Sequence, residues 1–281
     1  MSALRGRVSG ESSVMTDLRP WLAAVDHFDA SRKEALVGYD DARAERFYEQ
    51  LARVADHVGA TVRGVERLPP GRGLLVANHA FGWDSAFAIA LVRRATGRRI
   101  WVLGEHLWWD LPYVRGLAAA VGVVDGTMAN VDRLLQADEL VLVMPGGLRE
   151  ALKPRELRYR LLWGHHYGFV RAALRSQAPL VPLASFGADE WFDWVGDPYE
   201  RGRRWLRPLG IHLPLPRPWA GLPRVHRVRP EYVFGEPVMP TAGPEAEHDP
   251  ATLRHLRREI EGALHELIEE ELARRAGFAQ G

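Results

Sequence analysis

The sequence predicts an α/β fold, with a mixed, largely parallel sheet flanked by helices, an N-terminal helical pair and a C-terminal amphipathic helix. From about residue 74 to residue 185, short apolar runs typical of buried strands alternate with segments of helical period. Two helical patterns precede this region, and a long, charged helical pattern follows it. Alternation of this kind is typical of sheets whose parallel strands are joined by helices.

The periodicity also places the individual elements. Apolar residues recur at helical spacing over 18–28 and 44–58, and Gly59 is a natural stop for the second helix. Strands are predicted at 62–65, 74–77, 100–103, 122–124, 140–144 and 180–185 and within 224–234, and helices at 84–94, 106–120, 128–137, 168–176 and 250–276.

The length of the chain, 281 residues, favours one main domain. We expect residues 1–16 to be a disordered lead-in, 17–60 an N-terminal helical segment and 61–276 the α/β domain. Within that domain, residues 201–223 are rich in Pro, Arg and Trp and lack a clean period. We therefore expect this stretch to be an excursion from the core rather than a second domain.

Composition narrows the classes of function. A net charge of +1 gives no electrostatic basis for binding nucleic acid, and the absence of cysteine excludes thiolate chemistry and disulfides. No apolar stretch reaches the roughly 20 residues of a membrane span, and the N-terminus has no apolar core of signal-peptide length. We expect a cytoplasmic protein whose contact with a membrane, if it has one, is peripheral.

His79 and Asp84 mark the first candidate site, in the segment NHAFGWD that follows a predicted strand. A neutral imidazole in such a loop can take a proton from a hydroxyl, and a carboxylate on the first helical turn can fix its tautomer. Gly82 lets the loop between them bend. Alternatively, Asp84 caps the helix and His79 is an ordinary loop residue. A metal site is disfavoured, because no third ligand is evident.

Residues 145–150, PGGLRE, mark the second candidate site, again directly after a predicted strand. Adjacent glycines can present backbone N–H groups to an anion or a developing oxyanion. Arg149 can hold a phosphate or carboxylate, and Glu150 can orient Arg149 or a loop backbone. The alternative is a strand-ending turn with a surface ion pair. Both candidate sites follow strands of one α/β sheet, where such folds place ligand clefts.

These motifs resemble those of the glycerolipid acyltransferase superfamily, whose first motif is His-x4-Asp. The segment PGGLREAL is similar to the third motif of the branch that contains diacylglycerol acyltransferase type 2 and the phytyl-ester synthases. Further segments agree in order, namely GFV at 168–170, APLVPLASF at 178–186 and GEPVMP in the closing strand. The resemblance covers roughly residues 60–275.

The resemblance implies transfer of a fatty acyl group from acyl-CoA or acyl carrier protein to a hydroxyl of a glycerolipid or other lipid alcohol. It implies His79 as general base and Asp84 as its orienter, and no metal or redox cofactor. The residues that it implies for binding acyl group, acceptor or CoA phosphates are Asn78, Gly82, Pro145, Gly146, Gly147, Arg149, Glu150 and Pro182.

The chain departs from the family at the second motif, where Gly126 stands near the place of an arginine in members with phosphorylated acceptors. A neutral alcohol, or a larger head group recognised elsewhere, is therefore the more plausible acceptor. Lipid substrates would require docking on the inner face of the membrane, for which an Arg/Trp-rich surface is a candidate. That surface comprises Trp108, Trp109, Arg203, Arg204, Trp205 and Arg207. These side chains can equally be core tryptophans and solvated arginines.

Two other functions stay open. A thioester or ester hydrolase would use water in place of the alcohol, although the chain has no G-x-S-x-G segment. A catalytically silent lipid-binding protein would keep the fold and not the chemistry.

Overall fold

Seven strands form one sheet in the structure, a computed structural model that describes residues 39–80, 84–106, 112–193, 199, 204, 224–225 and 228–278. The order across the sheet is β1-β9-β6-β2-β5-β3-β4. The strands are β1 (Thr61–Arg63), β2 (Gly73–Ala77), β3 (Ile100–Gly104), β4 (Val123–Asp125), β5 (Leu140–Val143), β6 (Leu180–Phe186) and β9 (Glu231–Phe234). A separate antiparallel pair joins β7 (Phe192–Asp193) to β8 (Arg224–Val225).

The sheet is mixed and largely parallel, as the sequence predicts. The five strands β6, β2, β5, β3 and β4 run parallel to one another. The edge strands β9 and β1 are parallel to each other, and β9 is antiparallel to β6. In the central register, Val76 of β2 lies between Val143 of β5 and Pro182 of β6. The predicted α/β fold class is confirmed.

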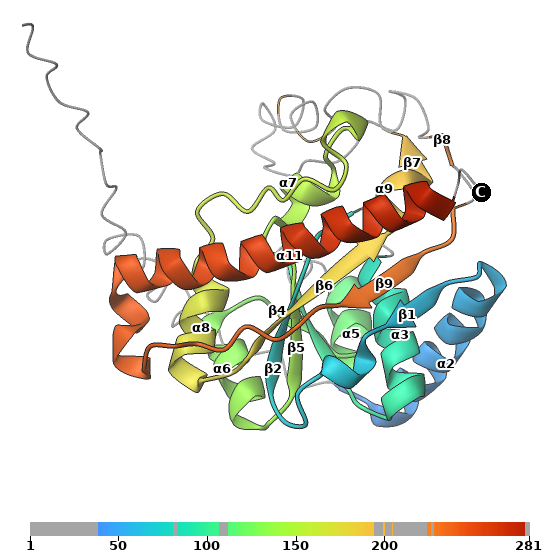
Figure 1. Ribbon diagram of the computed structural model, residues 1–281. Helices are drawn as coiled ribbons and strands as arrows, with labels where there is room; N and C mark the ends of the chain where they lie inside the picture. Colours follow the sequence, from blue (N-terminus) through green and yellow to red (C-terminus); the bar gives the residue numbers. More distant parts are fainter. Residues whose placement is uncertain are drawn as a thin grey trace, which may run out of the picture.

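Helices cover both faces of the sheet (Figure 1). On one face, α6 (Met128–Gln136), α8 (Gly168–Ser176) and α11 (Pro250–Phe278) bury apolar side chains against Leu74, Val76 and Val141. On the other, α2 (Asp41–His57) and α3 (Asp84–Thr96) bury theirs against Leu75 and Leu142. Helix α2 also packs on α5 (Pro112–Ala120). Because β2 is covered on both faces, all five of its residues are buried, and its sequence is a continuous small and apolar run.

The first and last helices of the described chain, α2 and α11, each bury one face against the core. In α11, the buried Leu253, Leu256, Ile260 and Leu264 repeat every three or four residues and join the core. Helix α2 begins after Asp40, whose side chain accepts a hydrogen bond from Arg43 N at 3.0 Å. The other predicted N-terminal helix, at 18–28, and the lead-in at 1–16 lie outside the described residues. The proposed domain boundaries stay predictions.

Two stretches differ in detail from the predicted local structure. His106 was expected to begin a helix, but it lies in a turn; within the predicted helix, α5 covers Pro112–Ala120. Proline suits the first helical position because it lacks an N–H, and the His106 ring bonds instead to Asp125 at the end of β4. The glycine segment after β5, for which a strand-ending turn was one alternative, contains a short helix, α7 (Gly147–Ala151).

Candidate functional site

The candidate site lies where the sheet changes the direction of its connections. Strand β2 leads to α3 on one face, whereas its neighbour β5 leads through α7 to α8 on the other. Loops that leave adjacent parallel strands toward opposite faces open a crevice at the carboxyl edge of the sheet. His79 follows β2, and Pro145, Gly146 and Gly147 follow β5. The fold therefore brings the two sequence motifs together.

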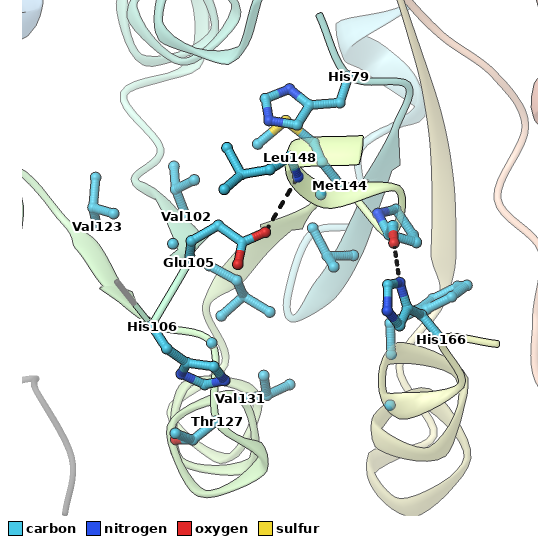
Figure 2. A pocket seen from close by; sticks show the side chains of 18 of the residues that line it. His79, Val102, Glu105, His106, Val123, Thr127, Val131, Met144, Leu148 and His166 are labelled. Carbon is cyan, nitrogen blue, oxygen red and sulfur yellow. Dashed lines mark hydrogen bonds between the residues drawn. The ribbon is translucent and has the colours of Figure 1, made fainter. Parts of the chain in front are cut away.

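A cavity of about 660 Å³ opens at this edge (Figure 2). Its wall is mostly apolar and comes from the ends of β3, β4 and β5 and from α6 and α8, with Val102, Leu103, Val123, Val131, Val143 and Phe169. His79, Pro145 and Gly147 also line it. The cavity has the size and character of a pocket for a small organic ligand with a long apolar part.

The backbone of His79 is held by side chains on both sides of its peptide unit. His79 N–H donates to Glu150 Oε1 at 2.7 Å, and Lys153 Nζ donates to His79 O at 2.6 Å. The second oxygen of Glu150 accepts from Leu162 N at 2.7 Å. The segment after β5 therefore fixes the main chain of His79, while the His79 ring lines the cavity (Figure 2).

Glu150 is fully buried, with 0% of its surface exposed. This burial raises the pKa of the Glu150 carboxyl, although Lys153 and the backbone donors Leu162 and His79 act in the opposite direction. The alternative of a surface ion pair is wrong for Glu150, and its expected role in holding a loop backbone is confirmed. Its carboxylate does not line the cavity. Its assignment to substrate binding stays a prediction.

Both glycines of the second motif have a structural reason. A Cβ on Gly146 would lie 2.1 Å from Glu150 Oε2, so a larger residue would displace the carboxylate. Gly147 has φ of +51°, and a Cβ there would lie 2.7 Å from Glu105 Oε1. Gly147 N–H donates to Met144 O at 3.0 Å. That amide therefore already has a backbone partner, and the role of the glycine amides as oxyanion donors stays a prediction.

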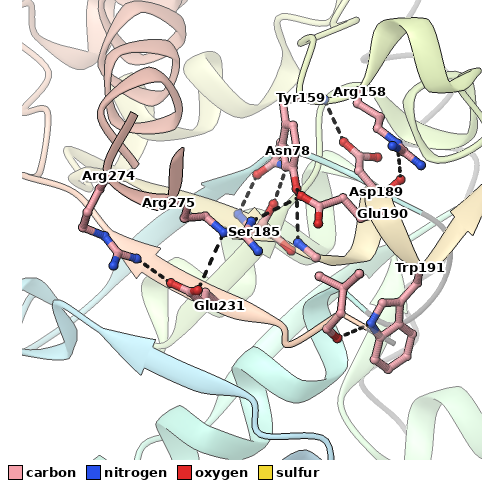
Figure 3. A network of polar contacts seen from close by, with 12 residues as sticks. Asn78, Arg158, Tyr159, Ser185, Asp189, Glu190, Trp191, Glu231, Arg274 and Arg275 are labelled. Carbon is pink, nitrogen blue, oxygen red and sulfur yellow. Dashed lines mark hydrogen bonds and ion pairs between the residues drawn. The ribbon is translucent and has the colours of Figure 1, made fainter. Parts of the chain in front are cut away.

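Asn78 and Pro182 serve the sheet rather than the cavity wall. Asn78 Nδ2 donates to Ser185 O at 2.9 Å, and its Oδ1 accepts from Ser185 N at 2.7 Å. This pair ties the end of β2 to β6 (Figure 3). Pro182 is buried in β6, where its ring approaches Gly235. Neither residue lines the cavity.

The remaining predicted residues lie away from the cavity or outside the described part. The Arg149 guanidinium lies over the Tyr199 ring, 5.2 Å from its centroid, and outside the cavity lining. Asp84 is the first residue of α3, but only its backbone is described, so its contact with His79 stays a prediction. Gly82 lies outside the described residues. So do Trp108, Trp109, Arg203, Trp205 and Arg207, whereas Arg204 is described and exposed.

A second histidine–carboxylate pair, which sequence reasoning missed, lies at the same cavity. His106, after β3, bonds through Nδ1 to Asp125 Oδ1 at the end of β4. Asp125 is buried, and its backbone oxygen accepts from Asn130 Nδ2 at 2.8 Å. Since a carboxylate accepts, Nδ1 carries the proton that it donates. The His106 ring lines the cavity wall (Figure 2).

His166 is the third histidine that lines the cavity. Its Nδ1 bonds to the backbone oxygen of Pro145 (Figure 2). A carbonyl can only accept, so Nδ1 is the protonated nitrogen. This contact ties the segment before α8 to the turn after β5.

The charge of the cavity wall is acidic. Of the described lining residues, Glu105 is a carboxylate, and none is an arginine or lysine. Glu105 Oε1 accepts from Leu148 N at 3.3 Å, which holds the carboxylate beside the start of α7 (Figure 2). Among the described lining residues, a phosphate would meet the like charge of Glu105 and no arginine or lysine. In the described part of the chain, no three His, Cys, Asp or Glu side chains gather into a set of metal ligands.

Comparisons with known proteins agree with the resemblance seen in the motifs. A family model described as diacylglycerol acyltransferase matches residues 79–211. The human protein named "DGAT1/2-independent enzyme synthesizing storage lipids" is 27% identical over 75% of this chain and 61% of its own length. The Mus musculus protein of the same name is 27% identical over 54% of this chain and 48% of its own.

Two further similarities come from bacteria. An uncharacterized protein of Mycobacterium leprae (strain TN) is 31% identical over 74% of this chain and 59% of its own length. The crystal structure of the 1-acyl-sn-glycerophosphate acyltransferase PlsC from Thermotoga maritima aligns over 89% of this chain and 94% of that chain, with 14% identity and a TM-score of 0.49. The chain spans about half the length of the first curated relatives that it matches. The predicted resemblance to lipid acyltransferases is confirmed.

Proposed function

We propose that this chain transfers a fatty acyl group from a thioester, acyl-CoA or acyl carrier protein, to the hydroxyl of a neutral lipid alcohol. The observation that carries the proposal is the position of His79. Its main chain is fixed by Glu150 and Lys153, and its ring faces an apolar cavity of about 660 Å³. The similarity to proteins named as diacylglycerol acyltransferase and as enzymes of storage lipid synthesis supports the class of reaction.

The chemistry follows from a histidine beside an apolar pocket. His79 takes the proton of the acceptor hydroxyl as its oxygen attacks the thioester carbonyl. The new C–O ester bond forms, the C–S bond breaks, and the thiol leaves with the proton that His79 returns. The acyl chain lies along the apolar wall of the cavity, which excludes water from the thioester. In this proposal Asp84 orients His79, as the first motif implies.

The acidic wall supports a neutral acceptor. Glu105 lies inside the cavity, and the described lining has no arginine or lysine to meet a phosphate. The phosphates of acyl-CoA must then remain outside, where Arg149 lies beside Tyr199. We assign Arg149 to those phosphates, and the neutral alcohol to the cavity.

The test is an acyl-transfer assay with purified protein, labelled long-chain acyl-CoA or acyl carrier protein, and a panel of acceptors. The panel contains diacylglycerol, monoacylglycerol, a long-chain alcohol and lysophosphatidate, with His79→Ala as the control. Label should move to a neutral alcohol with the wild type and not with the variant. Release of free fatty acid alone would establish a hydrolase. Bound lipid without turnover would establish a lipid-binding protein and overturn the proposal.

We also propose that the protein docks peripherally on the inner face of the membrane to reach its lipid acceptor. None of the helices in the described part of the chain has the length and hydropathy needed to cross a bilayer; α11 has 29 residues but is rich in charge. Co-sedimentation with vesicles containing an anionic phospholipid tests the idea. Binding should weaken with salt and with Arg204→Glu, because surface charges are screened. Equal recovery with purely zwitterionic vesicles would contradict it.

A further inference from the structure

We propose that Lys153 is a positioning residue of the acyl-transfer site. Its ammonium, neutralised by Asp189, holds the backbone carbonyl of His79 while Glu150 holds the backbone N–H, so that the imidazole is positioned through its main chain. The inference rests on the proposed role of His79. It concerns Lys153 and Asp189, two residues outside both sequence motifs.

The contacts of the ammonium are short and converge on one place. Lys153 Nζ lies 2.6 Å from His79 O and 2.8 Å from Asp189 Oδ1. The Lys153 side chain is 1% exposed and that of Asp189 is 5% exposed. A buried ammonium is costly unless it is paired and hydrogen-bonded, and here both conditions are met. Water could also donate a hydrogen bond to the backbone oxygen of His79. We infer that the buried Lys153–Asp189 pair is present because it fixes the position of His79.

Asp189 is itself fixed by neighbouring backbone and side-chain groups. Its Oδ2 accepts from Tyr159 N at 2.8 Å, and its backbone oxygen accepts from Arg158 Nε at 2.9 Å (Figure 3). Asp189 belongs to α9 (Ala188–Trp191), which follows β6. Lys153 follows β5, and His79 follows β2. The ion pair therefore joins the carboxyl ends of three adjacent strands at the position of His79.

Lysine is the residue type that this place requires. The chain has 37 Lys and Arg residues, and only Lys33 and Lys153 among them are lysine. An ammonium offers three donors around a single atom, whereas a guanidinium presents a planar fork of five. The compact ammonium of Lys153 can donate to the His79 carbonyl and to one oxygen of Asp189 from a buried position.

The first experiment compares Lys153→Met with Asp189→Asn and the wild type. If Lys153 positions His79, kcat should fall about 10–100-fold with Lys153→Met, because a displacement of about 1 Å at a catalytic group has this order of effect. KM for both substrates should stay within about twofold of wild type, since the cavity wall is unchanged. Asp189→Asn should lower kcat in the same direction and by less. Unchanged kcat in a folded Lys153→Met variant would overturn the proposal.

A matched control separates positioning from general loss of stability. Arg175 at the far end of α8 bridges Asp132 and Glu247, in an ion pair outside the cavity lining. Arg175→Met should lower the melting temperature and leave kcat unchanged. Amide hydrogen exchange of residues 78–80 provides a readout that does not depend on activity. It should accelerate in Lys153→Met and not in Arg175→Met. Equal acceleration in both would show a merely structural role.

Chemical rescue gives the sharpest test, because the chain has no cysteine of its own. A Lys153→Cys variant is alkylated in denaturant with bromoethylamine, which restores an amine of lysine length, or with bromoethane, which does not, and both products are refolded. The amine should restore kcat and protection of residues 78–80, and the neutral product should not. Equal recovery by both would overturn the proposal. Should wild type transfer no acyl group, the proposed function fails while the exchange measurement still decides whether Lys153 holds His79.

Discussion

His79 and His106 line the same cavity, and the described contacts hold the main chain of the first and the ring of the second. Glu150 and Lys153 hold the peptide groups of His79, whereas Asp125 bonds directly to Nδ1 of His106. By the logic of catalytic triads, a carboxylate on the ring is the usual way to prepare a base. Position in the sheet instead favours His79 as the catalytic base, because His79 lies between β2 and β5, where the connections change from one face of the sheet to the other. His106 lies two strands nearer the edge.

The comparison indicates that a buried carboxylate beside a histidine can hold either the backbone of the histidine or its ring. Glu150 holds the loop through the backbone N–H of His79, and in the proposed mechanism Asp84 orients the ring. Asp125 occupies one ring nitrogen, so proton exchange between His106 and a cavity ligand is left to Nε2. We therefore expect His79 to carry the chemistry and His106 to stabilise the ends of β3 and β4.

The largest expected effect comes from removing each ring in turn. His79→Ala should lower kcat by about 10²–10⁴-fold, the usual contribution of a general base. His106→Ala should change kcat far less. It should instead lower the free energy of unfolding by about 1–3 kcal/mol, because the buried Asp125 loses its hydrogen bond to the ring. Kinetics and urea unfolding of both variants check this, and the reverse pattern would assign the base to His106.

A smaller effect is expected at Glu105, the carboxylate that lies in the wall of the cavity. Glu105→Gln keeps an oxygen that can accept from Leu148 N and removes only the charge. Two unit charges about 10 Å apart at an effective dielectric of ~20 interact by about 1.7 kcal/mol, so kcat/KM for lysophosphatidate should rise about 15–20-fold. The kcat/KM for a neutral acceptor should stay unchanged. If the preference between the two acceptors does not move, Glu105 does not select the acceptor.

Sequence patterns predicted the parts of the molecule that have a local signal. The strands β2, β5 and β6 are continuous apolar runs because both faces of the sheet are covered, and α8 begins and ends where its period and Gly168 predict. The segments around His79 and Gly146 were predicted to meet because both follow parallel strands. The cavity and the two motifs were therefore within reach of sequence reasoning.

The contacts that organise the site have no local signal. Lys153 meets His79 across 74 positions, and His106 meets Asp125 across 19. The residues next to them in the sequence form no pattern that predicts these pairs, because the pairs depend on the order of strands in the sheet. One available signal was composition, since a lysine is rare in this chain and Lys153 lies three residues beyond Glu150. The prediction that His106 begins a helix was wrong for the same reason, because its ring bonds to Asp125 in β4.

The smallest expected effect is the dependence of stability on pH at Glu150. Burial raises the pKa of this carboxyl, so folding favours its protonated form. The stability that this contributes is fully present below the ordinary pKa of glutamate and is lost as pH rises through the raised value. Glu150→Gln lacks this titration. The free energy of unfolding of wild type relative to Glu150→Gln should therefore fall with rising pH, by about 1.4 kcal/mol for each unit of pKa shift.

Urea unfolding of both proteins from about pH 4.5 to pH 8 measures this difference. Curves that stay parallel would show that Lys153 and the two backbone donors balance the effect of burial on the pKa of Glu150, and a difference that rises with pH would show that they lower this pKa. The effect of Glu150→Gln on kcat should be opposite to its effect on stability. A glutamine cannot accept from both His79 N and Leu162 N without turning its NH₂ group toward one of these donors, so kcat should fall even where stability rises. A charge that costs folding energy and raises turnover would show that His79 is held in place at the expense of the fold.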